Sequence, residues 1–201
     1  LNSLAAAAIG FEKGLSAKTI IAGIGSYGGV RRRFEIKGIA GDVMVVDDYA
    51  HHPTEVSATL QAARDGWDRR IIAVFQPHLF SRTKSFYKEF AAAFMDSDVL
   101  IVTDIYPARE KPIKGVTGKL VFNAARSTGH KNVHYIPDLE NLQVSLDDII
   151  QENDMVITIG AGTIWRYGQS YFDHLINQEA AAWGGSYGNI KHHDKRIFLK
   201  R

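Results

Sequence analysis

The stretch VMVVDDYAHHPTE, residues 43–55, places a continuous apolar run directly before a polar turn and the start of a helix. Such a run is typical of a strand that is buried on both faces of a sheet. Further apolar runs lie at residues 71–75, 99–103, 133–136 and 155–159, and helix-like segments lie at 55–63, 83–95, 119–126, 139–150 and 164–177. This βαβ order predicts an α/β fold with a doubly wound, mostly parallel sheet.

The segment before this pattern has a different composition. Residues 34–39 alternate apolar and polar side chains before a turn at Gly41, so we expect one antiparallel edge strand there. Residues 2–28 are alanine-rich and predict two short helices. We expect two glycines to end the first helix and a serine to cap the second, namely Gly10, Gly14 and Ser16.

The end of the chain shows no sustained hydrophobic period. From Glu179 onward we expect a tail, with a short final strand or helix at residues 197–199 and with His192 and His193 solvated rather than bound to metal. We therefore divide the chain into a helical segment with a linker, a sheet domain and a tail, at residues 1–29, 30–178 and 179–201.

Composition narrows the functional classes. At 201 residues and 45% hydrophobic content, the chain is long enough for one core with an appendage. A formal net charge of +2 gives no global field to attract nucleic acid or an anionic membrane, so neither partner is expected. The lack of cysteine excludes disulfides and thiolate chemistry and fits the cytoplasm. The first residues include neither an initiator methionine nor a signal peptide, which predicts an internal fragment of a longer protein.

Polar residues follow the first buried strand, at the edge where a doubly wound sheet binds ligands. Asp48, Tyr49, His51 and His52 lie in this turn and could bind a ribose, a metal-bound phosphate or a substrate amine. The alternative is helix capping by Asp48 or His52, with Pro53 in the first turn. We favour a functional site because capping requires only one polar side chain.

A second polar cluster follows the strand at residues 71–75. His78 and Gln76 share this loop, and Arg82 lies near a helix start, where backbone amides and a guanidinium suit a phosphate or carboxylate. The alternative places Arg82 on the surface, with Ser81 as a simple cap. Two further candidates are weaker. The long loop at 104–112 could bind substrate or could be an ordinary surface loop. The small residues at 160–162 could allow a ligand to approach the backbone or could allow tight packing of a helix on the sheet.

A glycine-rich segment and a run of arginines lie between the predicted helices and the first strand. Gly23, Gly25 and Gly28 match a dinucleotide-binding fingerprint, but a strand rather than a helix is expected after them, so we reject a nicotinamide site. The arginines at 31–33 could meet ATP phosphates or could form an ordinary solvated linker.

Six segments in order carry a family resemblance: LNSLAA, GGVRRRFE, VDDYAHHPTE, VFQPHLFSRT, TDIYPAREKPIKGV and GAGTIW. Together they resemble the Mur ligases, from Asn2 to about Trp165, and most of all the branch that joins L-alanine to UDP-N-acetylmuramate. Two departures are Leu79, where many relatives have arginine, and Thr163, where they have aspartate. With Leu79 lacking a possible anion contact, Arg82 is expected to carry more of that role.

The resemblance implies the carboxy-terminal, Rossmann-like domain of a three-domain ligase, preceded by two helices of a central ATPase domain. It implies ATP and Mg²⁺ as cofactors, UDP-N-acetylmuramate and L-alanine as substrates, and an acyl-phosphate intermediate. Asn2, Arg33, Asp48 and Tyr49 are then expected on the nucleotide side. Three other residues are expected to line the amino-acid and acyl-phosphate pocket, namely His51, His78 and Arg82.

No P-loop sequence occurs in the chain, so this piece alone is expected to be inactive without the central ATPase and UDP-binding domains. No metal site is predicted within it. The alternatives left open are the related ligase that attaches a whole tripeptide during murein recycling, a nucleotide-binding or docking module without catalysis, and a nicotinamide oxidoreductase.

Overall fold

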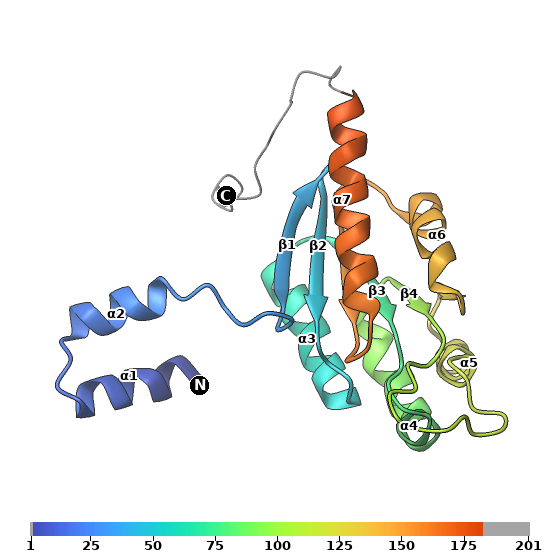
Figure 1. Cartoon of the computed structure of the whole chain (residues 1–201), viewed down its shortest axis with the longest axis horizontal. Coiled ribbons are helices and arrows are strands. Elements are labelled where there is room, and N and C mark those ends of the chain that lie inside the picture. The colour runs from blue at the N-terminus through green and yellow to red at the C-terminus, as the bar shows by residue number, and fades with distance from the viewer. Residues whose placement is uncertain (1, 183–201) are drawn as a thin grey trace. The chain divides into compact units, whose positions relative to one another are not determined.

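A computed structural model describes residues 2–182, which divide into two compact units at Arg31 and Arg32 (Figure 1). The first unit is a pair of helices, α1 (Asn2–Glu12) and α2 (Ala17–Gly25). As expected, Ser16 caps α2, and its hydroxyl accepts a hydrogen bond from the Thr19 amide at 3.2 Å.

Gly10 does not end α1, contrary to expectation. It lies inside the helix, where an added Cβ would come within 2.9 Å of the Ile20 side chain on α2. Its small size therefore lets the two helices approach closely. The chain turns instead at Gly14, whose φ of +75° favours glycine.

The second unit is built on a six-stranded sheet with the order β1-β2-β6-β3-β4-β5. The β1 strand pairs antiparallel with β2, and all other neighbours are parallel, which confirms the predicted edge strand and the predicted α/β class. The strands are β1 (Glu35–Ala40), β2 (Val43–Asp48), β3 (Arg70–Phe75), β4 (Val99–Val102), β5 (Val133–Tyr135) and β6 (Asp154–Ile159).

Helices cover both faces of this sheet, with α7 in front of the strands in Figure 1. The buried side chains of α3, α4 and α5 form a core cluster on one face, and those of α6 and α7 form a second cluster on the other. The helices are α3 (Pro53–Gly66), α4 (Phe80–Ala93), α5 (Lys119–Thr128), α6 (Leu142–Ile149) and α7 (Ile164–Ala182), with single 3₁₀ turns at η1 (Phe94–Asp96) and η2 (Leu139–Asn141).

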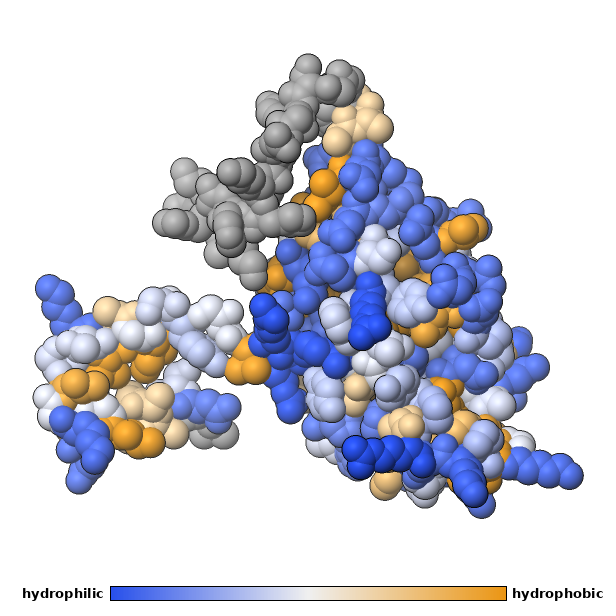
Figure 2. Space-filling view, viewed as in Figure 1, coloured by the Kyte–Doolittle hydropathy of each residue, from blue (hydrophilic) through white to orange (hydrophobic). Residues whose placement is uncertain are grey.

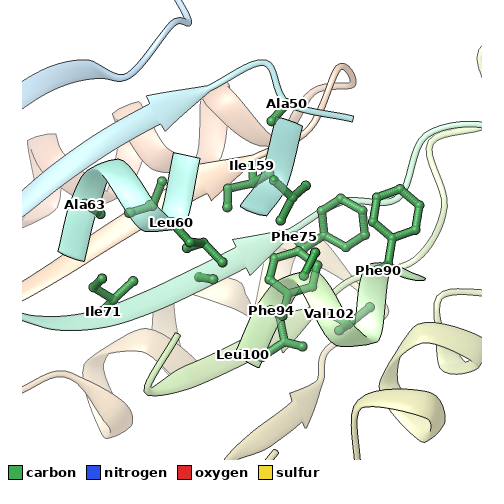
Figure 3. Packing of buried hydrophobic residues seen from close by; sticks show 14 of the residues in the cluster. Ala50, Leu60, Ala63, Ile71, Phe75, Phe90, Phe94, Leu100, Val102 and Ile159 are labelled. Atoms are coloured by element: carbon green, nitrogen blue, oxygen red, sulfur yellow. The ribbon is translucent and has the colours of Figure 1, made fainter. Parts of the chain in front are cut away.

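The first core cluster is centred on aromatic rings (Figure 3). Phe75 on β3 packs against Phe90 and Phe94, with ring centroids 4.9 and 4.8 Å apart. Alternate residues of each central strand face opposite clusters, so both faces of the strands are apolar. This double burial explains why the central strands appear in the sequence as continuous apolar runs.

The helix α7 continues to Ala182, beyond the expected end at residue 177 and through the start of the expected tail. Glutamate and alanine at 179–182 are strong helix formers, and the Glu179 carboxylate accepts a hydrogen bond from the Gly41 amide at 3.3 Å. His192, His193 and residues 197–199 lie outside the described residues. Between residues 2 and 182, no helix combines the length and the apolar character that a membrane crossing requires.

Candidate functional site

The carboxyl ends of β2, β6, β3 and β4 lie side by side, because these strands are parallel neighbours in the sheet. The polar turns that follow β2 and β3 therefore meet at one edge. Asp48, His78 and Arg82 all lie at this edge, so the structure brings together the clusters that the sequence separates.

Asp48 is buried and bonds to the protein backbone. Its carboxylate oxygens accept hydrogen bonds from the Phe34 and Ala50 amides, both at 2.7 Å. The carboxylate thus links the segment before β1 to the turn after β2. This geometry makes Asp48 a structural support of the turn that carries Tyr49 and His51.

His52 caps α3, as the capping alternative expected. Its Nδ1 accepts from the Thr54 amide at 3.4 Å, and Pro53 occupies the first turn. The Glu55 carboxylate completes a capping box by accepting from the His51 and His52 amides at 2.9 and 3.2 Å. Burial alone raises the pKa of Glu55, but these hydrogen bonds and the nearby His51 and Arg33 charges lower it overall.

The two arginines that enter β1 have different surroundings. Arg32 Nε lies 3.0 Å from the buried Asp47 carboxylate, and its Nη2 donates to the Gly160 carbonyl at 2.5 Å. Burial raises the pKa of Asp47 despite hydrogen bonds from Thr158 and Arg32. Arg32 therefore ties the linker to β2 and to the turn after β6, which is neither of the two roles that the sequence suggested.

Arg33 is exposed and lies over the ring of Tyr49, with its guanidinium carbon 5.8 Å from the ring centroid. Arg32 also lies over this ring, at 4.8 Å. The Tyr49 ring is in edge contact with His51, 5.2 Å away between centroids. Tyr49 thus joins the basic linker to the first histidine of the site.

His78, Arg82 and His51 form the centre of the cluster. Arg82 Nη1 lies 3.3 Å from His78 Nδ1, and the rings of His51 and His78 are 6.0 Å apart in an edge-to-face arrangement. Burial, followed by the neighbouring Arg82 and His51 charges, lowers the pKa of His78. These effects favour the neutral form of the ring beside a permanent positive charge.

Tyr106 supports His78 from the loop after β4. Its ring stacks on the His78 ring at 5.8 Å and 15°, and two backbone hydrogen bonds join the loops: Leu79 N to Tyr106 O at 3.0 Å and Tyr106 N to Pro77 O at 2.8 Å. The sequence indicated this loop through its length and through the family resemblance of TDIYPAREKPIKGV, and neither gave a role for Tyr106. A contact between two loops produces no periodic pattern of hydrophobic residues, so the pairing of Tyr106 with His78 could not be predicted from such a pattern.

The amino end of α4 already contacts an anion of the protein itself. The Glu110 carboxylate accepts from the Ser81 amide at 2.9 Å and from the Ser81 hydroxyl, and these two bonds lower its pKa. Ser81 is not the cap of α4, because the helix begins at Phe80 and the capping position is therefore Leu79. The Leu79 side chain makes no capping hydrogen bond. Glu110 was not predicted as a site residue, although it lies in the long loop and in the segment TDIYPAREKPIKGV that carries the family resemblance.

Gln76 connects the ends of β3 and β6. Its side-chain oxygen accepts from the Ile164 amide at 3.1 Å, at the start of α7. An added Cβ on Gly162 would meet this oxygen and would come within 2.6 Å of Tyr106 Cγ. The small size of Gly162 therefore allows tight packing of the site's own side chains, which differs from the two explanations offered from the sequence, close approach of a ligand and tight packing of a helix.

The remaining predicted features lie away from this cluster or do not fit it. Asn2 begins α1 in the first unit, which is described by itself. Gly23 and Gly25 lie within α2 rather than before a helix, so the dinucleotide fingerprint lacks its required context. Within residues 2–182, no group of three or more His, Asp and Glu side chains is placed to hold a metal ion.

The family profile described as "Mur ligase, glutamate ligase domain" matches residues 32–162. The chain belongs to the Mur ligase family. The matched range begins at Arg32 and ends at Gly162, so it includes every residue of the clustered site in this Mur ligase domain.

Named relatives agree with this membership. The chain is 48% identical over 182 residues to UDP-N-acetylmuramate–L-alanine ligase of Salinibacter ruber, which covers 90% of this chain and 38% of that protein. The chain thus spans under two fifths of the length of the curated relatives it matches.

Solved structures share the fold. The UDP-N-acetylmuramate-alanine ligase of Thermotoga maritima is similar with a TM-score of 0.73 at 26% identity, over 88% of this chain and 37% of that one. A murein peptide ligase of Psychrobacter arcticus is similar with a TM-score of 0.62 at 23% identity, over 88% and 36%. The second likeness concerns the fold alone.

Proposed function

We propose that this chain is the carboxy-terminal part of an ATP-dependent ligase that joins L-alanine to UDP-N-acetylmuramate in peptidoglycan precursor synthesis. The observation that carries the proposal is the convergence of His51, His78 and Arg82 at the carboxyl edge of the sheet. This edge is where open α/β sheets bind ligands. Membership of the Mur ligase family and the names of the relatives support the same reaction.

The reaction passes through an acyl phosphate, formed when ATP phosphorylates the substrate carboxylate, and the amine of L-alanine then attacks its carbonyl carbon. Both the phosphate and the alanine carboxylate are anions that a guanidinium recognises well. Arg82 is half-buried and contacts the His78 ring, which carries no negative charge that could neutralise the guanidinium. We assign Arg82 to the anion and the two histidines to the hydrogen bonds around the reacting carbonyl.

Within the sheet domain, the nucleotide side of the site is assigned to Arg33, Asp48 and Tyr49. Asn2, in the helical unit, is separately assigned to ATP in the complete enzyme. Arg33 is exposed over the Tyr49 ring and can reach a phosphate, whereas Asp48 acts through the shape of the turn, because both of its oxygens are used by backbone amides. Mg²⁺ and the P-loop are assigned to a central ATPase domain of the complete enzyme.

The complete enzyme is further proposed to include a UDP-binding domain, to work in the cytoplasm and to need no nucleic acid or membrane. On this proposal, the present chain alone does not catalyse the reaction. The related ligase that attaches a tripeptide to the same sugar nucleotide is the nearest alternative, and the amine substrate distinguishes the two. Faster turnover with the tripeptide than with L-alanine would overturn the proposed substrate.

The test of the site is Arg82→Ala in the complete enzyme, measured as phosphate released with L-alanine. Loss of a guanidinium that stabilises a developing anion should cost about 2 to 4 kcal/mol in kcat/KM. Lys84→Ala is the matched control, since it removes an exposed cation two residues along the same helix. Equal losses in both variants would show that Arg82 contributes only general positive charge.

A further inference from the structure

The hydrogen-bond partners of the six described histidines fix where each neutral ring carries its proton. A ring nitrogen that faces a carbonyl or carboxylate must donate, because these groups only accept. A ring nitrogen that faces an amide N–H or a guanidinium must accept, because those groups only donate. Each ring can be assigned on this basis.

Five of the six carry the proton on Nε2. The Nδ1 atoms of His52, His78 and His130 face donors, namely the Thr54 amide, the Arg82 guanidinium and the Asn132 amide. For the other two rings, Nε2 itself faces an acceptor. His134 Nε2 lies 2.7 Å from the Asn132 side-chain oxygen. His174 Nδ1 lies 3.2 Å from the Gln143 side-chain NH₂, a donor, and its Nε2 lies 3.1 Å from the Asp147 carboxylate. The Gln178 side-chain amide lies 2.9 Å from the same Nε2, and it accepts there when its oxygen and nitrogen exchange places.

His51 differs from the other five. Its Nδ1 lies 3.0 Å from the Tyr49 carbonyl oxygen and 3.3 Å from a Glu55 carboxylate oxygen, so Nδ1 carries the proton. Its Nε2 is then left with a free lone pair. The two imidazoles at the centre of the site, His51 and His78, are therefore opposite tautomers with ring centroids 6.0 Å apart.

We propose that His51 is the proton acceptor for the incoming amine and that His78, as the opposite tautomer, is a hydrogen-bond donor to the reacting acyl group. The chemical roles rest on the proposed function, whereas the tautomers rest on the hydrogen bonds alone. Glu55 and the Tyr49 carbonyl are the positioning groups, since they hold the proton of His51 on the nitrogen that does not react. The arrangement follows the general rule that the partner of one ring nitrogen determines the chemistry of the other.

Amide formation redistributes the three protons of the alanine ammonium and one electron pair of the acyl phosphate. His51 Nε2 takes one proton from the alanine ammonium, and the freed lone pair forms the C–N bond at the acyl carbon. The C–O bond to the phosphoryl group then breaks, and its electron pair leaves with phosphate. The second amine proton goes to that phosphate, the amide retains the third, and His51 returns its proton to water.

The tautomers can be measured without any turnover, by NMR of this 201-residue chain with ¹⁵N-labelled histidine at a pH where the rings are neutral. Long-range correlations from the ring carbons distinguish a protonated from an unprotonated nitrogen. We expect one described histidine with a protonated Nδ1, and its signals should disappear in His51→Gln. A protonated Nε2 on His51 would overturn the proposal, whatever the activity of the complete enzyme.

The role in the reaction is tested in the complete enzyme with two nucleophiles. His51→Gln should slow amide formation with L-alanine about 10²- to 10⁴-fold, the usual contribution of a positioned base. Hydroxylamine is already unprotonated at neutral pH, so trapping of the acyl phosphate as a hydroxamate should stay near the wild-type rate. His52→Asn, which keeps a capping side chain on the neighbouring residue, should leave both rates unchanged.

Three results decide between the proposals. Equal loss of amide and hydroxamate in His51→Gln would overturn the proton-acceptor role. A hydroxamate rate that persists while amide formation falls would support it. If the wild-type enzyme makes neither product from UDP-N-acetylmuramate and ATP, the proposed function fails and the proton-acceptor role with it, but the tautomers measured by NMR would still stand.

Discussion

Replacing Gly162 with alanine should destabilise the sheet domain because the new methyl group has no space. Its Cβ would collide with the Gln76 side-chain oxygen and would lie 2.6 Å from Tyr106 Cγ and 2.7 Å from Tyr106 Cβ. Tyr106 cannot easily move, since its backbone is bonded to Pro77 and Leu79. Overpacking of this kind costs about 1 to 3 kcal/mol, and losing the bond from Gln76 to the Ile164 amide adds about 1 kcal/mol.

We therefore expect Gly162→Ala to lower the free energy of unfolding by about 2 to 4 kcal/mol, measured by urea denaturation of the chain. Gly66→Ala is the matched control, because no atom lies within 4 Å of its added Cβ and alanine favours the helix in which it lies. That variant should be neutral or more stable by a few tenths of a kcal/mol, roughly. If Gly162→Ala were as stable as the control, Tyr106 and Gln76 would not be held as tightly as the hydrogen bonds indicate.

Arg32→Ala should lower the free energy of unfolding, measured by urea denaturation, by about 3 kcal/mol, because it leaves the buried Asp47 carboxylate without its arginine. Arg33→Ala should change the free energy of unfolding by less than about 0.5 kcal/mol, because Arg33 is exposed. Similar losses in both variants would contradict the different roles of the two arginines. Leu79 has a φ of +71°, so Leu79→Gly should be more stable than Leu79→Ala by about 1 kcal/mol in thermal denaturation, and the reverse order would argue against backbone strain there. Burial and nearby positive charge lower the pKa of His78, so just below the ordinary value of 6.5 the unfolded chain binds more protons than the folded one. The free energy of unfolding should consequently fall as the pH drops through 6.5, and His78→Gln should reduce this slope; an unchanged slope would show that His78 does not contribute to it.

The sequence predicts the sheet well because strands that are buried on both faces consist mostly of apolar residues. The central strands β2, β3, β4 and β6 are covered on both faces, and each appears as a mostly apolar run. The glycine that ends a helix was harder to identify. Gly10 and Gly14 are not told apart by the sequence, but in the structure α2 packs against Gly10, whereas Gly14 has a positive φ.

The site was predicted less completely, because its parts are defined by pairings across the edge of the sheet. Arg32 and Arg33 are adjacent residues of the same type, yet one binds a buried carboxylate and the other is exposed. Tyr106 is held beside His78 by hydrogen bonds between two loops, and no local sequence pattern indicates these bonds.

The surface of the first unit was not predicted either, because the sequence does not show that apolar residues of α1 and α2 are exposed. Hydrophobic side chains gather on the surface of this unit in Figure 2, and Leu4, Ile9 and Ile21 are between 63% and 71% exposed, although the sequence predicts an ordinary pair of helices.

The carboxylate of Glu110 on the amino end of α4 has a consequence for measurements of affinity. A negatively charged ligand that comes to the Ser81 amide must first displace a group of the same charge. Such an exchange leaves the number of charges at this spot unchanged. Binding there should accordingly respond less to added salt than binding to an open cationic site, and its strength will report a difference between two competing anions.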